Sequence, residues 1–347
     1  MNTQIIDWND KKKAVTALQN QELVCFPTET VYGIAAIANS ESAFKKLVEA
    51  KKRPPEKPFT LMCASIGQAV QYAEVDVGTI AVMKRFMPGQ ITLLLKARKG
   101  LDPWLTLGSD TIGVRVPDCD ELLDLIERVE CPLLVPSANT SGQNPALTCD
   151  EAKSYFDGKC EVIIDGKTSS SIPSTIACIK DGKISLVRQG QVSFEEMAKV
   201  YSEASMTVSL GSDHGGFVQK EAIKEHLQNI GISVLDFGTD SLASCDYPLF
   251  GKAAAKAVVE GKADFGIVVC TSGEGISIAA NKVPGVRCGI GYDDVVTQKT
   301  REHNNANVIA FGAKYMATED VLRRVDIFLS EKFSKFEKHH KRVDMLE

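Results

Sequence analysis

The sequence predicts an α/β protein of two domains, and three observations lead to this prediction. The chain has 347 residues, more than a single domain usually holds. Short apolar runs alternate with amphipathic stretches throughout, as in proteins of mixed strands and helices. From residue 207 onward the alternation is strictly strand–helix–strand, which predicts a Rossmann-like, doubly wound parallel sheet. We therefore expect a twisted α/β domain over residues 1–204, with a linker helix at 191–204, and a Rossmann-like domain over residues 205–347.

The first domain opens with an apolar run at 22–26, which a proline ends. A helix with an N-cap-like serine is expected over 40–53. Further strand-like runs follow, with helical stretches between several of them, at 59–65, 91–97, 111–117, 131–137, 160–166, 174–180 and 184–190.

The second domain begins with a strand at 207 and a glycine turn. The next helix, 218–231, is expected to end at Gly231, because glycine adopts the left-handed conformation that closes helices. The expected alternation then continues with strand 233–238, helix 247–261, strand 264–270, helix 276–282, strand 286–292, another helix, strand 307–313 and a C-terminal helix.

The composition excludes several classes of protein. A net charge of −5 gives no global reason to expect nucleic acid as a partner. The polar N-terminus and the lack of an 18-residue apolar run predict neither a signal peptide nor a membrane span. Ten scattered cysteines without a CxxC pair predict a reduced, cytoplasmic protein without structural zinc. All five histidines lie after residue 213, so the first domain uses no histidine-based triad or histidine-bound metal.

Cys270 stands at the end of an apolar strand, directly before a glycine-containing loop. Backbone amides of a loop that opens a helix can bind an anion or a developing oxyanion. The same dipole lowers the pKa of a thiol, which favours a base or a nucleophile. From the local pattern alone, a buried structural cysteine before a tight turn is an equal alternative. The loop comprises Thr271, Ser272, Gly273, Glu274 and Gly275.

Other polar residues flank the strands of the same predicted sheet. Asp213 and His214 follow the first strand, and Asp246 begins a helix. His303 and Asn304 come just before the last strand. We expect a thiol, two imidazoles and a carboxylate along one rim of the sheet, where a sugar phosphate could bind.

These motifs together resemble ribose-5-phosphate isomerase type B, the RpiB/LacAB family. The resemblance is carried over residues 207–347 by GSDHGGF, DYP, CTSGEGISIAANKVPGVRCGI, REHNNANVIAFGAK and KHHKRV. It implies aldose–ketose isomerisation without metal or cofactor. Cys270 would be the base that moves a proton through an enediolate, assisted by Ser272, while His303 would open the sugar ring. The family shares its site across a dimer, so the resemblance implies a homodimer or tetramer.

The same resemblance assigns substrate-binding residues. Asp213, His214 and Asn304 would hold the sugar, and the loop amides of residues 271–275 would stabilise the enediolate. Arg342 matches the family's phosphate-binding pattern, whereas Lys314 and Lys338 stand where the family commonly has arginine. Lysine neutralises phosphate but lacks the bidentate fork of arginine. Allose 6-phosphate and galactose 6-phosphate therefore stay open as alternative substrates, and a regulatory sugar-phosphate sensor is a third possibility.

A basic cluster marks the first domain. Lys51, Arg53 and Lys57 lie at the end of the predicted helix and in the proline-rich loop after it. Such a cluster can bind a polyphosphate without a P-loop, although alone it is more often a solvated basic turn. The segment PSANTSG, at 136–142, adds hydroxyls and an amide after a strand.

With PTETVYG, RFMPGQIT, VRVP, STI and VRQG, these segments resemble the YrdC-type threonylcarbamoyl-AMP synthase family over roughly residues 10–195. The implied reaction joins L-threonine, bicarbonate and ATP, with Mg²⁺, for the t6A modification of tRNA. No nucleophile or resident metal site is evident. Phosphate and ATP contacts would come from Lys51, Arg53, Lys57, Thr92, Ser137, Asn139 and Arg188, and threonine contacts from Thr28, Thr30, Arg115 and Ser174.

The sequence therefore predicts a fusion of two enzymes. The alternative for the first domain is a non-catalytic module that binds double-stranded RNA on a basic concave face. Partners in tRNA modification are expected only for the synthase. Nothing in the sequence explains why the two activities are joined.

Overall fold

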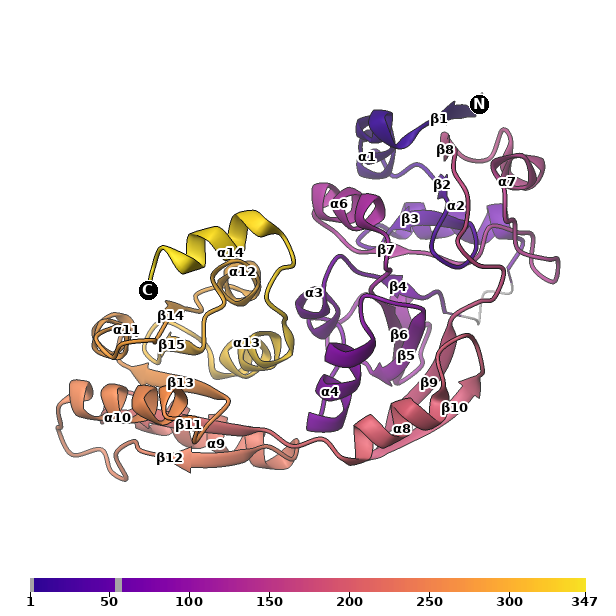
Figure 1. Ribbon diagram of the computed structural model, residues 1–347. Helices are drawn as coiled ribbons and strands as arrows, with labels where there is room; N and C mark the ends of the chain where they lie inside the picture. The colour runs from indigo at the N-terminus through magenta and orange to yellow at the C-terminus, as the bar shows by residue number, and fades with distance from the viewer. Residues whose placement is uncertain (1–2, 54–57) are drawn as a thin grey trace. The chain divides into compact units, whose positions relative to one another are not determined.

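The computed structural model describes residues 3–53 and 58–347. The chain forms two compact units, each with its own sheet (Figure 1). The first comprises the residues up to Glu74 and Arg85–Val200, and the second comprises Val75–Lys84 and Tyr201–Glu347. Among the described residues, no helix is long and apolar enough to cross a membrane.

The first unit is built on a mixed ten-stranded sheet with the order β1-β8-β2-β3-β7-β4-β6-β5-β9-β10. Its middle strands are almost wholly buried, as their apolar sequences require. The strands are β1 (Gln4–Ile6), β2 (Val24–Phe26), β3 (Gly33–Ile37), β4 (Leu61–Met62), β5 (Ile91–Lys96), β6 (Thr111–Arg115), β7 (Leu133–Leu134), β8 (Val162–Ile164), β9 (Thr175–Lys180) and β10 (Lys183–Arg188).

Every predicted strand-like run of this unit contains a strand, but β1 and β3 were not predicted. β3 pairs antiparallel with β2, and the intervening residues 27–32 form the turn between them. Only the run at 22–26 was predicted to be a strand, so the second arm of this hairpin was missed.

Helices pack around this sheet, and hydroxyl caps define several of their starts. Ser40 accepts a hydrogen bond from the amide of Ala43, and Thr148 accepts one from that of Glu151. The helices of this unit are α1 (Lys11–Gln19), α2 (Glu41–Lys51), α3 (Ile66–Val70), α5 (Pro103–Thr106), α6 (Asp120–Val129) and α7 (Cys149–Phe156), preceded by a short 3-10 helix at Trp8–Asp10. α4 (Val77–Phe86) follows α3 in sequence, but most of its residues belong to the second unit. The predicted linker helix is α8 (Phe194–Ser202).

The second unit has a five-stranded sheet with the order β12-β11-β13-β15-β14, and all of its pairings are parallel. This confirms the predicted doubly wound sheet. The strands are β11 (Thr207–Ser212), β12 (Ser233–Asp236), β13 (Phe265–Cys270), β14 (Cys288–Ile290) and β15 (Val308–Gly312). The helices are α9 (Phe217–Asn229), α10 (Tyr247–Val259), α11 (Glu274–Asn281), α12 (Asp294–Asn304), α13 (Thr318–Ser330) and α14 (Glu337–Asp344).

Helices cover both faces of this sheet (Figure 1). α10 and α11 pack together on β11, β13 and β15, while α9 packs on the other side with α13, which in turn contacts α12. Val268, Ile276 and Ala310 belong to the apolar core beneath α10 and α11. Gly231 has a φ of 84° just after α9, as predicted for a helix-ending glycine. The single C-terminal helix of the prediction is in fact two, α13 and α14.

Candidate active sites

A cavity of about 260 Å³ opens where several strands of the first unit begin or end. It lies at the start of β5, just before β9, and at the ends of β4, β6 and β10, so residues far apart in sequence meet there. Seven residues predicted to bind ATP or threonine line it, namely Thr30, Arg53, Thr92, Arg115, Ser137, Ser174 and Arg188.

Arg188 is anchored to the segment before β9. Its guanidinium donates hydrogen bonds of 2.8 and 3.2 Å to the carbonyl oxygen of Ser174, and the Ser174 hydroxyl lies 2.9 Å from that of Thr92. A bulge between Leu186 and Arg188 shifts the register of β10 against β9. Such a bulge re-aims a side chain, here at the end of the strand. Burial and the nearby charge of Arg115 lower the pKa of Arg188.

Arg115, at the end of β6, is a second cation that lines the cavity. It donates to Glu29 Oε1 at 2.6 Å and to the Thr30 hydroxyl at 3.0 Å. Thr28 does not line the cavity, but its hydroxyl lies 2.9 Å from that of Thr30 and orients it. Glu29 stands inside the quoted PTETVYG motif and was not selected as a site residue. Its signal was a lone carboxylate among hydroxyl-bearing residues.

Lys51 lies behind the cavity wall. Its ammonium donates hydrogen bonds to the carbonyl oxygens of Ser137 and Asn139, each at 2.6 Å, and to Asn139 Oδ1 at 3.0 Å. Burial, with the charge of Arg53, lowers the pKa of Lys51 to about 8. Lys51 and Asn139 therefore shape the loop at 136–142 rather than line the cavity. Lys57 lies outside the described residues.

Arg53 stands at the cavity itself. It donates to the carbonyl oxygen of Pro58 at 2.8 Å and lies 4.7 Å from the centre of the Phe59 ring. Together with Arg115 and Arg188 it places three guanidinium groups on one hollow. None of the described lining residues is an Asp or Glu, so the cavity surface is strongly positive and suits an anionic ligand.

In the second unit, Cys270 occupies the carboxyl end of β13 and is buried. The amide of Gly273 donates to its sulfur at 3.1 Å. Gly273 has a φ of 83° at the start of α11, a conformation that favours glycine. The thiol thus lies at the amino end of α11 and accepts a hydrogen bond from it.

Further predicted residues stand at the same edge of the sheet. Asp213 follows β11, is buried, and accepts the amide of Gly216 at 3.1 Å. His214 Nδ1 accepts the amide of Cys245 at 3.1 Å. Nδ1 is therefore unprotonated, and Nε2 carries the hydrogen of the neutral ring. Lys314 follows β15, where its amide donates to the carbonyl oxygen of Thr271.

His303 and Asn304 lie at the opposite edge, so the expectation of one rim within a single chain was wrong. Both residues end α12, which runs back from the carboxyl edge. β15 then starts at Val308, which pairs with Gly266, whereas Cys270 pairs with Gly312 at the far end of the strand. In a parallel sheet, residues just before a strand lie at its amino edge. Ser272, Glu274 and Gly275 stay with Cys270 in the loop and first turn of α11.

A second polar cluster forms at this amino edge. The His303 ring stacks on His339 of α14, with centroids 4.1 Å apart and planes at 19°. Burial, with the charges of Lys338 and Arg342, lowers the pKa of His339. The predicted residues Lys338 and Arg342 thus gather with His303. His339 was missed, although it stands within the quoted KHHKRV segment.

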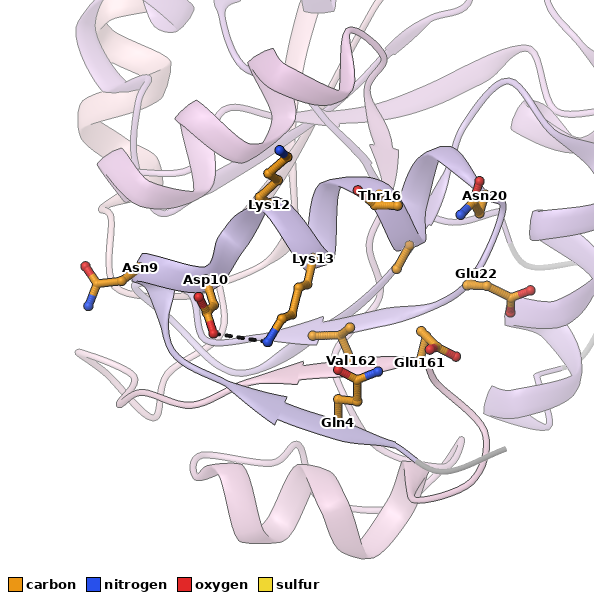
Figure 2. Close-up of a pocket in the computed structure, with 11 residues that line it drawn as sticks. Gln4, Asn9, Asp10, Lys12, Lys13, Thr16, Asn20, Glu22, Glu161 and Val162 are labelled. Carbon is orange, nitrogen blue, oxygen red and sulfur yellow. Dashed lines mark hydrogen bonds and ion pairs between the residues drawn. The ribbon is translucent and has the colours of Figure 1, made fainter.

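A wider hollow of about 890 Å³ lies along α1, β1 and β8 (Figure 2). Lys13 and Asp10 form an ion pair within it, and the other polar side chains at its wall, such as Lys12 and Glu22, are exposed or half-buried. None of the predicted site residues within the described ranges lines it. It has no buried polar group that would define a ligand.

Comparison with known proteins agrees with this division. The model of the Sua5/YciO/YrdC family, described as "Telomere recombination", matches residues 16–190. The model of the LacAB/RpiB family, described as "Ribose/Galactose Isomerase", matches residues 208–346. Ribose-5-phosphate isomerase B of Mycolicibacterium paratuberculosis is 43% identical over 142 residues, which are 41% of this chain and 89% of that protein. The chain belongs to both families.

The Sua5/YciO/YrdC relatives include a longer protein. Threonylcarbamoyl-AMP synthase of Pyrococcus abyssi is 38% identical over 188 residues, which are 54% of this chain and 55% of that protein. The chain thus spans about half the length of this relative. A solved structure of a P. abyssi Sua5 variant has 27% identity and a TM-score of 0.55, covering 82% of this chain and 98% of that one. The Sua5/YciO/YrdC unit and the LacAB/RpiB unit are named accordingly below.

Proposed function

We propose that the chain is a bifunctional enzyme. The Sua5/YciO/YrdC unit joins L-threonine, bicarbonate and ATP into threonylcarbamoyl-AMP, which serves tRNA modification. The LacAB/RpiB unit interconverts ribose 5-phosphate and ribulose 5-phosphate. The observation that supports the first activity is that seven predicted residues line one cavity. The observation that supports the second is that the Cys270 sulfur accepts a hydrogen bond from the Gly273 amide at the start of α11.

The proposed synthase acts by positioning and charge stabilisation. The threonine amine adds to bicarbonate with loss of water, which forms a carbamate. A carbamate oxygen then attacks the α-phosphorus of ATP, and the bond to pyrophosphate breaks so that pyrophosphate leaves with the developing negative charge. Arg53 and Arg188 neutralise that charge, while Arg115 and Thr30 hold threonine. No described lining residue offers a carboxylate for Mg²⁺, so the ion would arrive on the ATP phosphates and keep most of its waters.

The proposed isomerase uses Cys270 as its base. The thiolate removes the proton from C2 of the open-chain aldose, and the hydroxyl proton of O2 moves to O1. The thiol then returns its proton to C1 of the enediolate, which leaves the carbonyl group at C2. Amides of the loop at residues 271–275 stabilise the enediolate oxygen, because negative charge is favoured at the amino end of a helix, here α11. His214, as a neutral Nε2–H donor, holds a substrate oxygen at the same edge.

A complete isomerase site then needs two copies of the chain. His303 opens the sugar ring, and Lys338 and Arg342 bind the phosphate, but all three belong to the amino-edge cluster. A second copy that places this cluster against the Cys270 edge unites them. A homodimer or tetramer is therefore part of the proposal.

One pair of assays tests both activities in the full-length protein. Threonine-dependent release of pyrophosphate from ATP tests the synthase, and its absence with retained RNA binding would favour the RNA-binding alternative. Conversion of ribose 5-phosphate tests the isomerase. We expect Cys270→Ala to lower kcat by about 100-fold or more, as loss of a general base does.

The matched control is Cys119→Ala, which removes a half-buried thiol of the first unit and should leave isomerisation unchanged. Full activity in Cys270→Ala would return this thiol to a structural role. Turnover of allose or galactose 6-phosphate instead of ribose 5-phosphate would keep the chemistry and change the substrate.

A further inference from the structure

Three unsatisfied polar atoms gather beside the cavity of the Sua5/YciO/YrdC unit. Glu29 Oε2, Gln90 Oε1 and Arg115 Nε are buried and have no hydrogen-bond partner in the described part of the chain. Their residues are linked, because Arg115 donates to Glu29 Oε1 at 2.6 Å and the Gln90 amide donates to the Glu29 carbonyl at 3.3 Å. The three unsatisfied hydrogen-bonding atoms therefore belong to one network.

Such atoms are costly unless something satisfies them. Glu29 and Arg115 are each only 7% exposed, and a buried polar atom without a partner loses its hydration and gains nothing in exchange. The network adjoins the cavity, since Arg115 and Thr30 both line it. Glu29 and Gln90 do not line the cavity themselves but contact this wall through Arg115 and each other. Unmet hydrogen bonds in a network that reaches a cavity wall indicate a ligand that supplies the missing partners.

The donor or acceptor character of these three atoms limits the chemical class of the ligand. Two are acceptors, on Glu29 and Gln90, and one is a donor, on Arg115. A nucleotide phosphate could use only the donor. An α-amino acid offers ammonium hydrogens to both acceptors and a carboxylate oxygen to the guanidinium.

The distribution of charge leads to the same ligand. The described lining residues carry three arginines and no carboxylate. Glu29 compensates one of them, Arg115, through the 2.6 Å ion pair. The part of the cavity at Arg115 is thus charge-balanced and suits a zwitterion.

We propose that Glu29 determines specificity for an α-amino acid by receiving its ammonium group, with Gln90 as the second acceptor. This inference rests on the proposed synthase function and adds to it a carboxylate that recognises the ammonium group of the amino acid. A ligand with hydroxyl in place of ammonium lacks the positive charge that Glu29 requires. The cavity should therefore reject the hydroxy-acid analogue of threonine.

Direct binding to the wild-type protein is the first test, because it needs no variant. Binding of L-threonine and of 2,3-dihydroxybutanoate of the same configuration is measured by calorimetry in the presence of a non-hydrolysable ATP analogue. We expect the hydroxy acid to bind about tenfold more weakly or worse, as sites that hydrogen-bond a group reject analogues that lack it. Equal affinities would overturn the inference.

The second test is Glu29→Gln, with Glu130→Gln as the matched control. Glu130 is an exposed residue just after α6, so its substitution removes the same charge at a distance from the cavity. We expect Glu29→Gln to raise the KM for threonine about tenfold or more. The ratio of the affinities for threonine and for the hydroxy acid should become smaller. The dissociation constant for the ATP analogue, which reports a folded cavity, should stay within about twofold.

The outcomes separate this inference from the proposed function. Wild-type protein that releases no pyrophosphate with threonine contradicts the function itself. Wild-type protein that does so, combined with an unchanged threonine KM in Glu29→Gln, contradicts only the role of Glu29. Loss of ATP-analogue binding in Glu29→Gln would show that the carboxylate holds the whole cavity together, which would also overturn a specific role toward ammonium.

Discussion

At the scale of single residues, Lys51 connects protonation to ligand binding. Its ammonium uses three hydrogen bonds to hold the loop at 136–142, and burial with the charge of Arg53 lowers its pKa to about 8. The charged form dominates below this value and the neutral amine above it. A bound polyphosphate favours the charged form, so above about pH 8 ATP binding must take up a proton.

We therefore expect ATP affinity to fall as the pH rises through about 8, by at most about tenfold per pH unit for one linked proton. Equilibrium binding of Mg-ATP between about pH 7 and 9.5 measures this. Lys51→Arg should remove the pH dependence, since a guanidinium keeps its charge throughout this range. A wild-type affinity that does not change across the range would contradict the link.

At the scale of elements, the loop between β13 and α11 depends on the strand beside it. A Cβ atom at Gly312, in β15, would lie 2.4 Å from the carbonyl oxygen of Ser272. A backbone oxygen cannot rotate away as a side chain can, so Gly312→Ala must displace the loop that brings the Gly273 amide to Cys270. We expect isomerase activity to fall about tenfold or more, because small displacements of catalytic groups are costly.

The synthase activity of the same variant is the internal control, together with its far-ultraviolet circular dichroism. Both should match the wild type, because Gly312 belongs to the second unit. Equal losses of both activities would mean that the variant is misfolded, and full isomerase activity would mean that the loop position does not matter.

Much of each element, but less of its placement, could be predicted from the sequence. The hydrophobic periodicity and the turn residues predicted the parallel sheet of the second unit, because the local pattern determines where each of its strands begins. They could not give the bulge that re-aims Arg188, which depends on pairing between β9 and β10. Nor could they reveal that Glu29 is buried against Arg115, residues 86 positions apart. The edge of the second sheet at which His303 lies was predictable in principle, since residues that come just before a parallel strand lie at the amino edge of the sheet.

At the scale of the whole molecule, the two edges of the second sheet determine how many copies an active isomerase needs. Cys270 is the last residue of β13, and His303 lies just before β15, which is parallel to β13. If catalysis needs both residues, each site combines the carboxyl edge of one copy with the amino edge of another. Neither Cys270→Ala nor His303→Ala should then be active alone.

Mixing the two inactive variants should restore activity. In a mixed dimer, one site carries both substitutions, whereas the other pairs an intact Cys270 with an intact His303. Random exchange of an equal mixture makes half of the dimers mixed, so about a quarter of wild-type activity is expected. The measurement is ribose 5-phosphate turnover before and after subunit exchange in a mild denaturant, with each variant exchanged alone as the control. Activity that stays at the sum of the separate variants would mean that the proposed isomerase site is completed within one chain, against the geometry of its sheet.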